Sequence, residues 1–160
     1  MAHDNAVIHN DLSTFQYLTS TSNGYLQAFR INYDIIGNAA IGKYAFVEGS
    51  GNIALQESTH AEGKLTFANG YGAHAEGIGT YVEGIGSHVE GIGSQVLISD
   101  PTNPDIIDYG QHAEGVRSLS QGTAAHAEGW ESEASGFAAH SEGSGTKASG
   151  DNAHAEGGYT

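Results

Sequence analysis

Polar and apolar residues alternate along most of this chain in units of seven residues, of which there are 16 from Ala39 onward. The second position of each unit is Ala, Val or Ser, and larger or polar residues flank it. Alternation with a period of two is typical of a β-strand, so we expect a strand of about four residues in each unit. Gly fills the fourth position in 14 of the units, which indicates a corner after each strand. Strand and corner in succession predict a β-solenoid.

Two units make one coil of the predicted solenoid. Seven His residues begin alternate units and lie 14 apart, except for a gap of 24 between His88 and His112. We expect a 10-residue inserted loop within about 98–109 to account for this gap. The repeat domain then covers residues 38–160. Residues 1–37 have no period and crowd aromatic residues among polar ones, which predicts a strand-rich N-terminal cap or attachment segment.

The residue at the second position of each unit and the residue just before the unit are mostly small, and they share one face of the strand. We expect this face to line the inside of a narrow coil. The first and third positions then point outward. In alternate units they are His and Glu with little variation, whereas the other units vary freely. Solvent does not impose such strict repetition, so we expect these two columns at an interface between three chains. The columns are His60, Glu62, His74, Glu76, His88, Glu90, His112, Glu114, His126, Glu128, His140, Glu142, His154 and Glu156.

Buried carboxylates are costly unless they are paired, so each Glu is expected to accept a hydrogen bond from a His of the same or a neighbouring chain. This pairing predicts a raised pKa for His and a lowered pKa for Glu. Two alternatives stay open from the residues: a wet or exposed surface, and a metal ion held on the axis by three His. Seven identical layers favour a structural role, so we expect no metal and no cofactor.

The insertion contains both prolines and three acidic residues. Loops that leave a repeat scaffold often bind, so the segment offers a candidate receptor contact made by Asp105, Ile106, Ile107, Asp108 and Tyr109. Packing of this loop on a neighbouring chain explains it equally well. Outward aromatic side chains at Phe67, Tyr81, Trp130 and Phe137 could stack against sugar rings, although single exposed aromatics are common.

The alternation of Ala-His-Ala-Glu-Gly (residues 73–77) with Thr-Lys-Ala-Ser-Gly (residues 146–150) resembles the head repeats of YadA-like trimeric autotransporter adhesins. The resemblance covers residues 38–160 and implies a left-handed parallel β-roll, three chains side by side, in a rigid stalk or head that binds host surfaces. His and Glu stand where the adhesins have Val and Ile. The His-Ala-Glu-Gly form is similar to repeats in phage tail fibres and appendages, and the absence of a secretory signal favours that type.

The composition of the chain argues against several classes of partner and of activity. The 160 residues carry a net charge of −14 with five basic residues, too few for the basic stripe that nucleic acid requires. No run approaches 18 apolar residues, so we expect no membrane insertion. The absence of Cys removes thiol chemistry, and a His-Glu pair that recurs seven times argues against a single catalytic centre, so we expect no enzyme.

Together these features predict an all-β homotrimeric segment that projects and presents a host-recognition surface. Its partners would be two further copies of the chain and a cell-surface glycan or protein, in an extracellular location on a virion tail or a bacterial surface. The alternative is a purely structural shaft, or a trimerisation scaffold for a domain outside this sequence.

Overall fold

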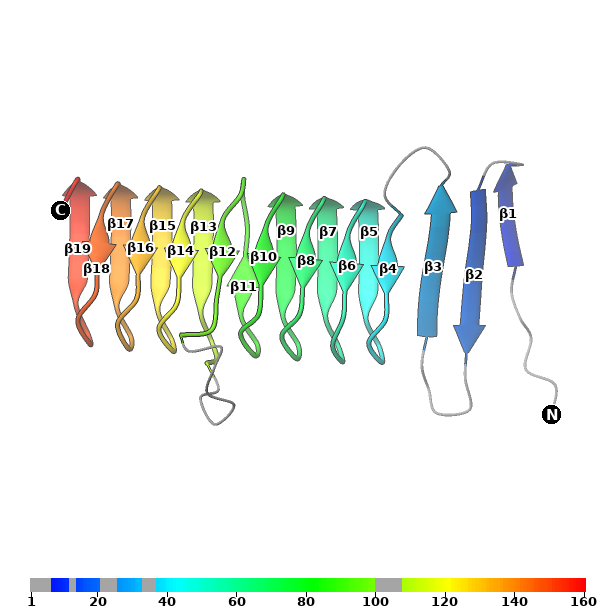
Figure 1. Cartoon of the computed structure of the whole chain (residues 1–160), viewed down its shortest axis with the longest axis horizontal. Helices are drawn as coiled ribbons and strands as arrows, with labels where there is room; N and C mark the ends of the chain where they lie inside the picture. The colour runs from blue at the N-terminus through cyan, green and yellow to red at the C-terminus, as the bar shows by residue number, and fades with distance from the viewer. Residues whose placement is uncertain (1–6, 12–13, 21–25, 33–36, 100–107) are drawn as a thin grey trace.

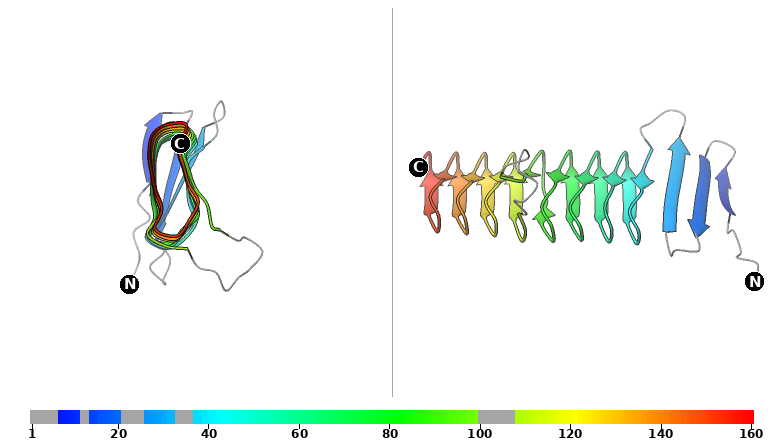
Figure 2. Two further views of the ribbon diagram at one scale, coloured as in Figure 1. Left: turned by 90° about the vertical axis from the view of Figure 1, so that its left-hand side faces the viewer. Right: turned by 60° about the horizontal axis from the view of Figure 1, so that its bottom comes forward.

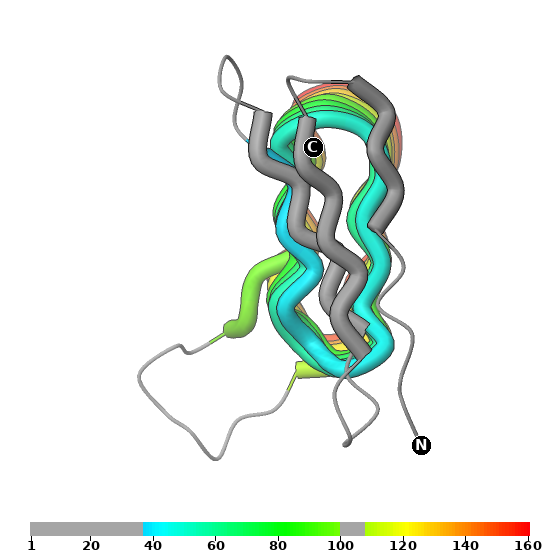
Figure 3. Tube along the Cα trace, turned by 90° about the vertical axis from the view of Figure 1, so that its right-hand side faces the viewer, coloured from blue at the N-terminus to red at the C-terminus, as the bar shows by residue number. Residues whose placement is uncertain are grey.

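From Ala39 onward the chain forms a parallel β-solenoid of about eight turns (Figure 1). The structure is a computed structural model that describes residues 7–11, 14–20, 26–32, 37–99 and 108–160. It confirms the all-β fold and the coil made of two seven-residue units, and the described residues include no helix. Viewed along the rod, successive coils superimpose in one flattened outline (Figure 2, left, and Figure 3).

Two sheets form the long sides of this outline. The eight-stranded sheet contains β5 (Phe46–Ser50), β7 (His60–Lys64), β9 (His74–Ile78), β11 (His88–Val89), β13 (His112–Val116), β15 (His126–Trp130), β17 (His140–Ser144) and β19 (His154–Gly158). The opposite sheet contains β4 (Ala39–Ala40), β6 (Ile53–Ala54), β8 (Phe67–Ala68), β10 (Tyr81–Val82), β12 (Gln95–Val96), β14 (Leu119–Ser120), β16 (Glu133–Ala134) and β18 (Lys147–Ala148). The strands differ from the expected length of about four residues: those of the opposite sheet have two residues, and those of the eight-stranded sheet have five, except for the two-residue β11.

Every strand of the solenoid pairs in register with the strand one coil away. His60 lies opposite His74, and His88 lies opposite His112 although the insertion comes between them in the sequence. A parallel bridge between Ile85 and Tyr109 shows where the coil resumes. The strands on the two sides of the expected insertion therefore keep the register of consecutive coils, although residues 100–107 lie outside the described part of the chain.

The interior of the solenoid is narrow and contains small side chains, as the sequence predicts. Ala61, Ala75 and Val82 are fully buried, and so are hydroxyl residues such as Ser94 and Ser118. The hydroxyl of Ser94 donates to the carbonyl of Gly115 at 3.1 Å, and that of Ser118 to Gly129 at 3.2 Å. These bonds satisfy polar groups that would otherwise be costly inside the coil.

The glycine at the fourth position serves close stacking of coils, and it is not the corner that the sequence predicted. A Cβ on Gly70 would lie 2.0 Å from the carbonyl oxygen of Gly84 in the next coil, although Gly70 has no positive φ. In the long strands the same glycine, such as Gly63, combines this close approach with a φ of 104°. The backbone turns instead at the sixth position, where φ is positive in every described unit. That position holds Gly at Gly72 but Ala at Ala138.

We expect Ala138→Gly to stabilise the protein. Ala138 is exposed and has a φ of 50°, and left-handed backbone costs a residue with a Cβ about 1–2 kcal/mol. Gly loses about 0.5–1 kcal/mol more chain entropy on folding, so the free energy of unfolding should rise by roughly 0.5–1 kcal/mol. Denaturant unfolding measures it. The neighbouring Ala139→Gly is the control: Ala139 is buried without positive φ, and its replacement should destabilise the protein.

The first three strands are antiparallel: β1 (Val7–Asp11) pairs with β2 (Thr14–Ser20), and β2 pairs with β3 (Leu26–Asn32). β3 joins the solenoid through one antiparallel pair, Phe29 with Ala39. The expected strand content of this segment is confirmed, and its role as a cap stays a prediction.

Candidate functional site

The outward surface of the eight-stranded sheet, here called the HxE face, carries the His column and the Glu column side by side. Consecutive imidazole rings from His60 to His154 have centroids 4.5–5.0 Å apart and planes within 16° of parallel. Phe46 continues the column by one coil, with its ring 5.1 Å from that of His60. The in-register pairing of the strands places all these rings on one line along the rod.

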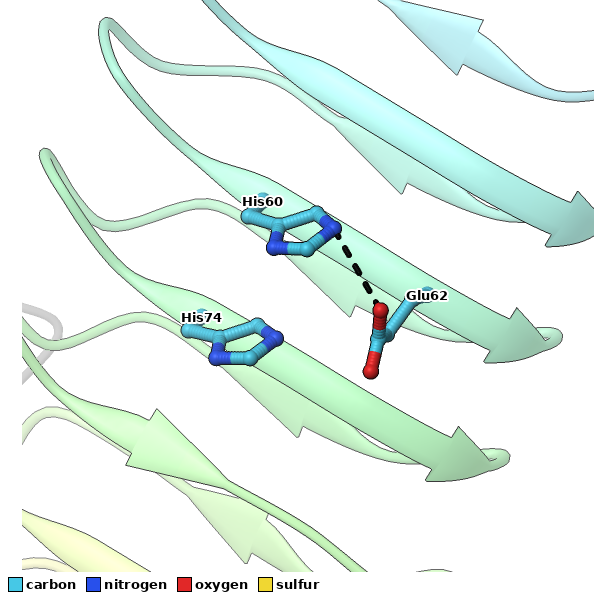
Figure 4. Close-up of side chains that lie close together, drawn as sticks. All are labelled: His60, Glu62 and His74. Atoms are coloured by element: carbon cyan, nitrogen blue, oxygen red, sulfur yellow. Dashed lines mark ion pairs between the residues drawn. The ribbon is translucent and has the colours of Figure 1, made fainter.

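The carboxylates lie beside the imidazoles at ion-pair distance, as the dashed line between His60 and Glu62 marks in Figure 4, but beyond hydrogen-bond distance. In six coils the Nε2 atom of His lies 3.6–3.9 Å from a carboxylate oxygen of the Glu two residues on, which is too long for a hydrogen bond. Within the described part of the chain, the Nε2 atoms of six His are buried without a hydrogen-bond partner: His60, His74, His88, His112, His126 and His140. Such atoms call for a partner that one chain does not supply.

The charge state of the columns differs from the expectation. Burial, then the like charge of neighbouring imidazoles, lowers the pKa of His74, His112 and His126. A hydrogen bond shared with Glu90 raises the pKa of Glu76 to about 7, and the same bond lowers the pKa of Glu90. Within a single chain, the pKa shifts of these three His and of Glu76 therefore run opposite to the directions expected for a paired interface, whereas that of Glu90 runs as expected. Burial is the first cause for the His residues, and the hydrogen bond between the two carboxyl groups is the first cause for Glu76 and Glu90.

Metal binding within one chain is limited by the stacking. Sets such as His60, Glu62 and His74 have ligand atoms within 4.8 Å of one another. An ion about 2.0–2.1 Å from two imidazole nitrogens needs them within roughly 4.2 Å, with lone pairs that converge. Stacked rings keep their lone pairs parallel. One coil of one chain thus offers one His and one Glu, too few for a tetrahedral site.

The candidate receptor contact in the insertion is only partly described. Asp105, Ile106 and Ile107 lie outside the described residues. Asp108 is 3% exposed; its carboxylate accepts from the backbone N–H of Ser99 and, at 2.7 Å, from the hydroxyl of Thr123. These contacts close the base of the insertion, and the burial of Asp108 argues against its role as a receptor contact. Tyr109 is exposed.

The four candidate sugar-stacking aromatics fall in three places. Phe67 and Tyr81 are half-buried and stack on one another on the sheet opposite the HxE face, with ring centroids 5.0 Å apart. Trp130 follows the glycine of β15, whereas Phe137 lies in the turn that precedes β17. The structure therefore does not bring the four together into one platform.

Tyr81 should titrate at unusually high pH. Burial, then its hydrogen bond of 2.5 Å to Glu83, raises the pKa of the phenol to about 12. Tyr81 should therefore stay neutral while an unfolded tyrosine ionises near pH ~10. Glu83→Gln should lower this pKa, because it removes the negative charge but not the burial. Ultraviolet titration, with Tyr81→Phe subtracted to isolate this phenol among eight, tests the prediction; an unchanged value in Glu83→Gln would contradict it.

Two rows of apolar side chains, which sequence reasoning missed, border the HxE face. The post-glycine row follows the glycine of each long-strand unit; its apolar members are Ile78, Ile92 and Trp130, all exposed, and the half-buried Val116. The turn row lies three residues before each His; its apolar members are the exposed Tyr71, Ile85, Tyr109 and Phe137. Alignment of the sequence at the period of the coil would have revealed both.

Comparison with family models, curated proteins and solved structures finds no match to this chain. The described residues include no helix long and apolar enough to cross a membrane.

Proposed function

We propose that this chain is a non-enzymatic segment of a trimeric surface fibre that projects and presents a host-recognition surface. It would act on a virion tail or a bacterial cell surface, as a left-handed roll whose first three strands cap the solenoid. The partners would be two further copies of the chain and a host glycan or protein.

The observation that supports this proposal most directly is the contrast between the two sides of the rod. The HxE face repeats one pattern over seven coils and, among the described residues, leaves six buried Nε2 atoms without partners. The opposite sheet varies from Phe67 and Tyr81 to Glu133 and Lys147. A constant face suits contacts between copies, and a variable face and a lateral insertion suit recognition.

The energetics of the coil also favour association. The interior holds Ala, Val, Ser and Thr, which bury little apolar surface per residue. Burial of apolar surface stabilises a fold by roughly 25 cal/mol per Å². Such a core therefore offsets little of the backbone entropy cost of folding, which is about 1–2 kcal/mol per residue. Contacts between chains would add the missing burial.

Two measurements test the proposal. Light scattering should give three times the single-chain mass of 16.6 kDa. Fluorescently labelled protein should bind cells of the host, and replacement of residues 98–107 by a short Gly-Ser linker should abolish binding while the trimer is kept. Full binding by this variant and by Tyr81→Ala would show that the contact lies elsewhere on the chain. No binding by the wild-type protein would favour a structural shaft, and the mass of a single chain would overturn the trimer.

A further inference from the structure

The two apolar rows lie on opposite borders of the HxE face. Along the chain the order is turn row, His, Glu, post-glycine row, with the turn row just before the strand that begins at the His, and the strand rises about 3.3 Å per residue. The two rows therefore run along the two narrow edges of the flattened coil and do not meet within one chain. Ile92 and Trp130 on one edge, and Tyr71 and Tyr109 on the other, are each 52–56% exposed.

The apolar parts of both rows occupy the same stretch of the rod. Ile78 of the post-glycine row comes seven residues after Tyr71 of the turn row and seven before Ile85, so its level is between theirs. Thr123 interrupts the turn row, beside the buried base of the insertion. Towards the N-terminal end both rows become charged, with Glu57 on one border and, half a coil later, Lys64 on the other.

Such a surface fits one kind of partner. The apolar side chains of the post-glycine row recur once per coil, at a spacing of about 4.8 Å, through every coil from β9 to β15. A partner that matches each step needs the same repeat along its own length. A second copy of this chain, parallel and in register, has that repeat.

We propose that neighbouring copies join edge to edge, with the post-glycine row of one chain packed on the turn row of the next. This inference rests on the proposed trimer and names its contact residues. Rotation about an axis parallel to the rod brings the Glu side of one HxE face to the His side of the next. Each orphaned Nε2 atom then donates to a carboxylate of the neighbouring chain.

This arrangement relieves two costs that the single chain carries. Aromatic and aliphatic side chains that are exposed to water in one chain become buried on both borders. The stacked imidazoles gain groups of opposite charge across the interface, whereas in one chain burial and then their like neighbours lower the pKa of His74 and His112. The arrangement also assigns Tyr109, Trp130 and Phe137 to contacts between chains, away from receptor or sugar.

A charge-swap experiment tests the edge contact. Ile92→Lys and Tyr109→Glu should each reduce the mass in light scattering from that of three chains toward that of one, and the double variant should restore the trimer. The two residues lie on opposite borders of their own chain, so rescue requires contact between chains. Gln95→Lys, exposed in the same coil on the opposite sheet, should leave the mass unchanged.

A cross-linking experiment keeps the inference testable if the charged variants fail to fold. The chain contains no Cys, so Ile92→Cys with Tyr109→Cys introduces a single reactive pair. A short bifunctional maleimide should join chains into covalent dimers and trimers. If the wild-type chain is trimeric but the cysteine variant does not cross-link, or if the single charged variants stay trimeric, the edge contact is overturned and the proposed function still stands. A monomeric wild type would overturn both.

Discussion

Gly70→Ala is expected to destabilise the solenoid by more than about 4 kcal/mol, whereas Gly72→Ala two residues later should cost only about 1 kcal/mol. A Cβ on Gly70 would lie 2.0 Å from the Gly84 oxygen and within 2.7 Å of two further backbone atoms. Favourable contacts between heavy atoms begin at about 3.5 Å, so the two coils would have to separate and break their ladder. Gly72 has a φ of 64° and nothing within 4 Å of its Cβ position.

The pair separates two reasons for glycine that sequence alone confuses. Gly70 tests close approach without backbone strain, and Gly72 tests strain without close approach. Denaturant unfolding followed by circular dichroism, at one chain concentration for both variants, measures each loss. Equal losses, or a larger loss for Gly72→Ala, would show that coil stacking is not what requires glycine at the fourth position.

The sequence predicted the features that depend on alternation and period. Small residues such as Ala61 lie inside, His60 and Glu62 point outward, and an insertion separates β12 from β13. These follow from a two-residue period, which determines sides, and from a coil of constant length, which determines register.

The sequence did not predict features that arise from contacts between coils. A period shows where glycine recurs, but it does not show that the backbone of the next coil leaves no room for a side chain. The sequence therefore predicts a corner at the fourth position, where the structure has close stacking of coils. Asp108 is a candidate for recognition from the sequence because inserted loops often bind, whereas in the structure its carboxylate accepts hydrogen bonds from Ser99 and Thr123. The pKa directions in the two columns depend on burial of the imidazoles and on contacts between like groups of neighbouring coils, and the spacing of residues in the sequence shows neither.

Gln111→Ala should lower the free energy of unfolding by about 3 kcal/mol or more, the second largest loss we expect. Gln111 is 1% exposed at a position where other coils have Ala, Ser or Thr. Its side-chain N–H groups donate to the carbonyls of Leu97 at 2.8 Å and Gln121 at 3.0 Å. Its carbonyl oxygen accepts from the hydroxyl of Ser87 at 3.1 Å. Truncation would leave two carbonyls unpaired and a cavity.

The position of this amide explains why the insertion is tolerated. In regular coils the fourth-position glycine of the opposite sheet faces a backbone carbonyl of the next coil, as Gly70 faces Gly84. At Gly84 the insertion has removed that peptide from the stack, and the atom that a Cβ would meet, at 1.9 Å, is the Oε1 of Gln111. The side-chain amide thus replaces the missing peptide group and continues the stack past the loop.

Two companion variants separate the hydrogen bonds from the volume. Gln111→Met keeps most of the volume, so a loss close to that of Gln111→Ala would assign the effect to the unpaired carbonyls. Gln95→Ala removes an exposed glutamine from the neighbouring strand β12 and should change stability by less than about 0.5 kcal/mol. If Gln111→Ala unfolded at the wild-type denaturant concentration, the loop would need no substitute peptide. The insertion would then be an independent addition to a solenoid already stable on both sides of it.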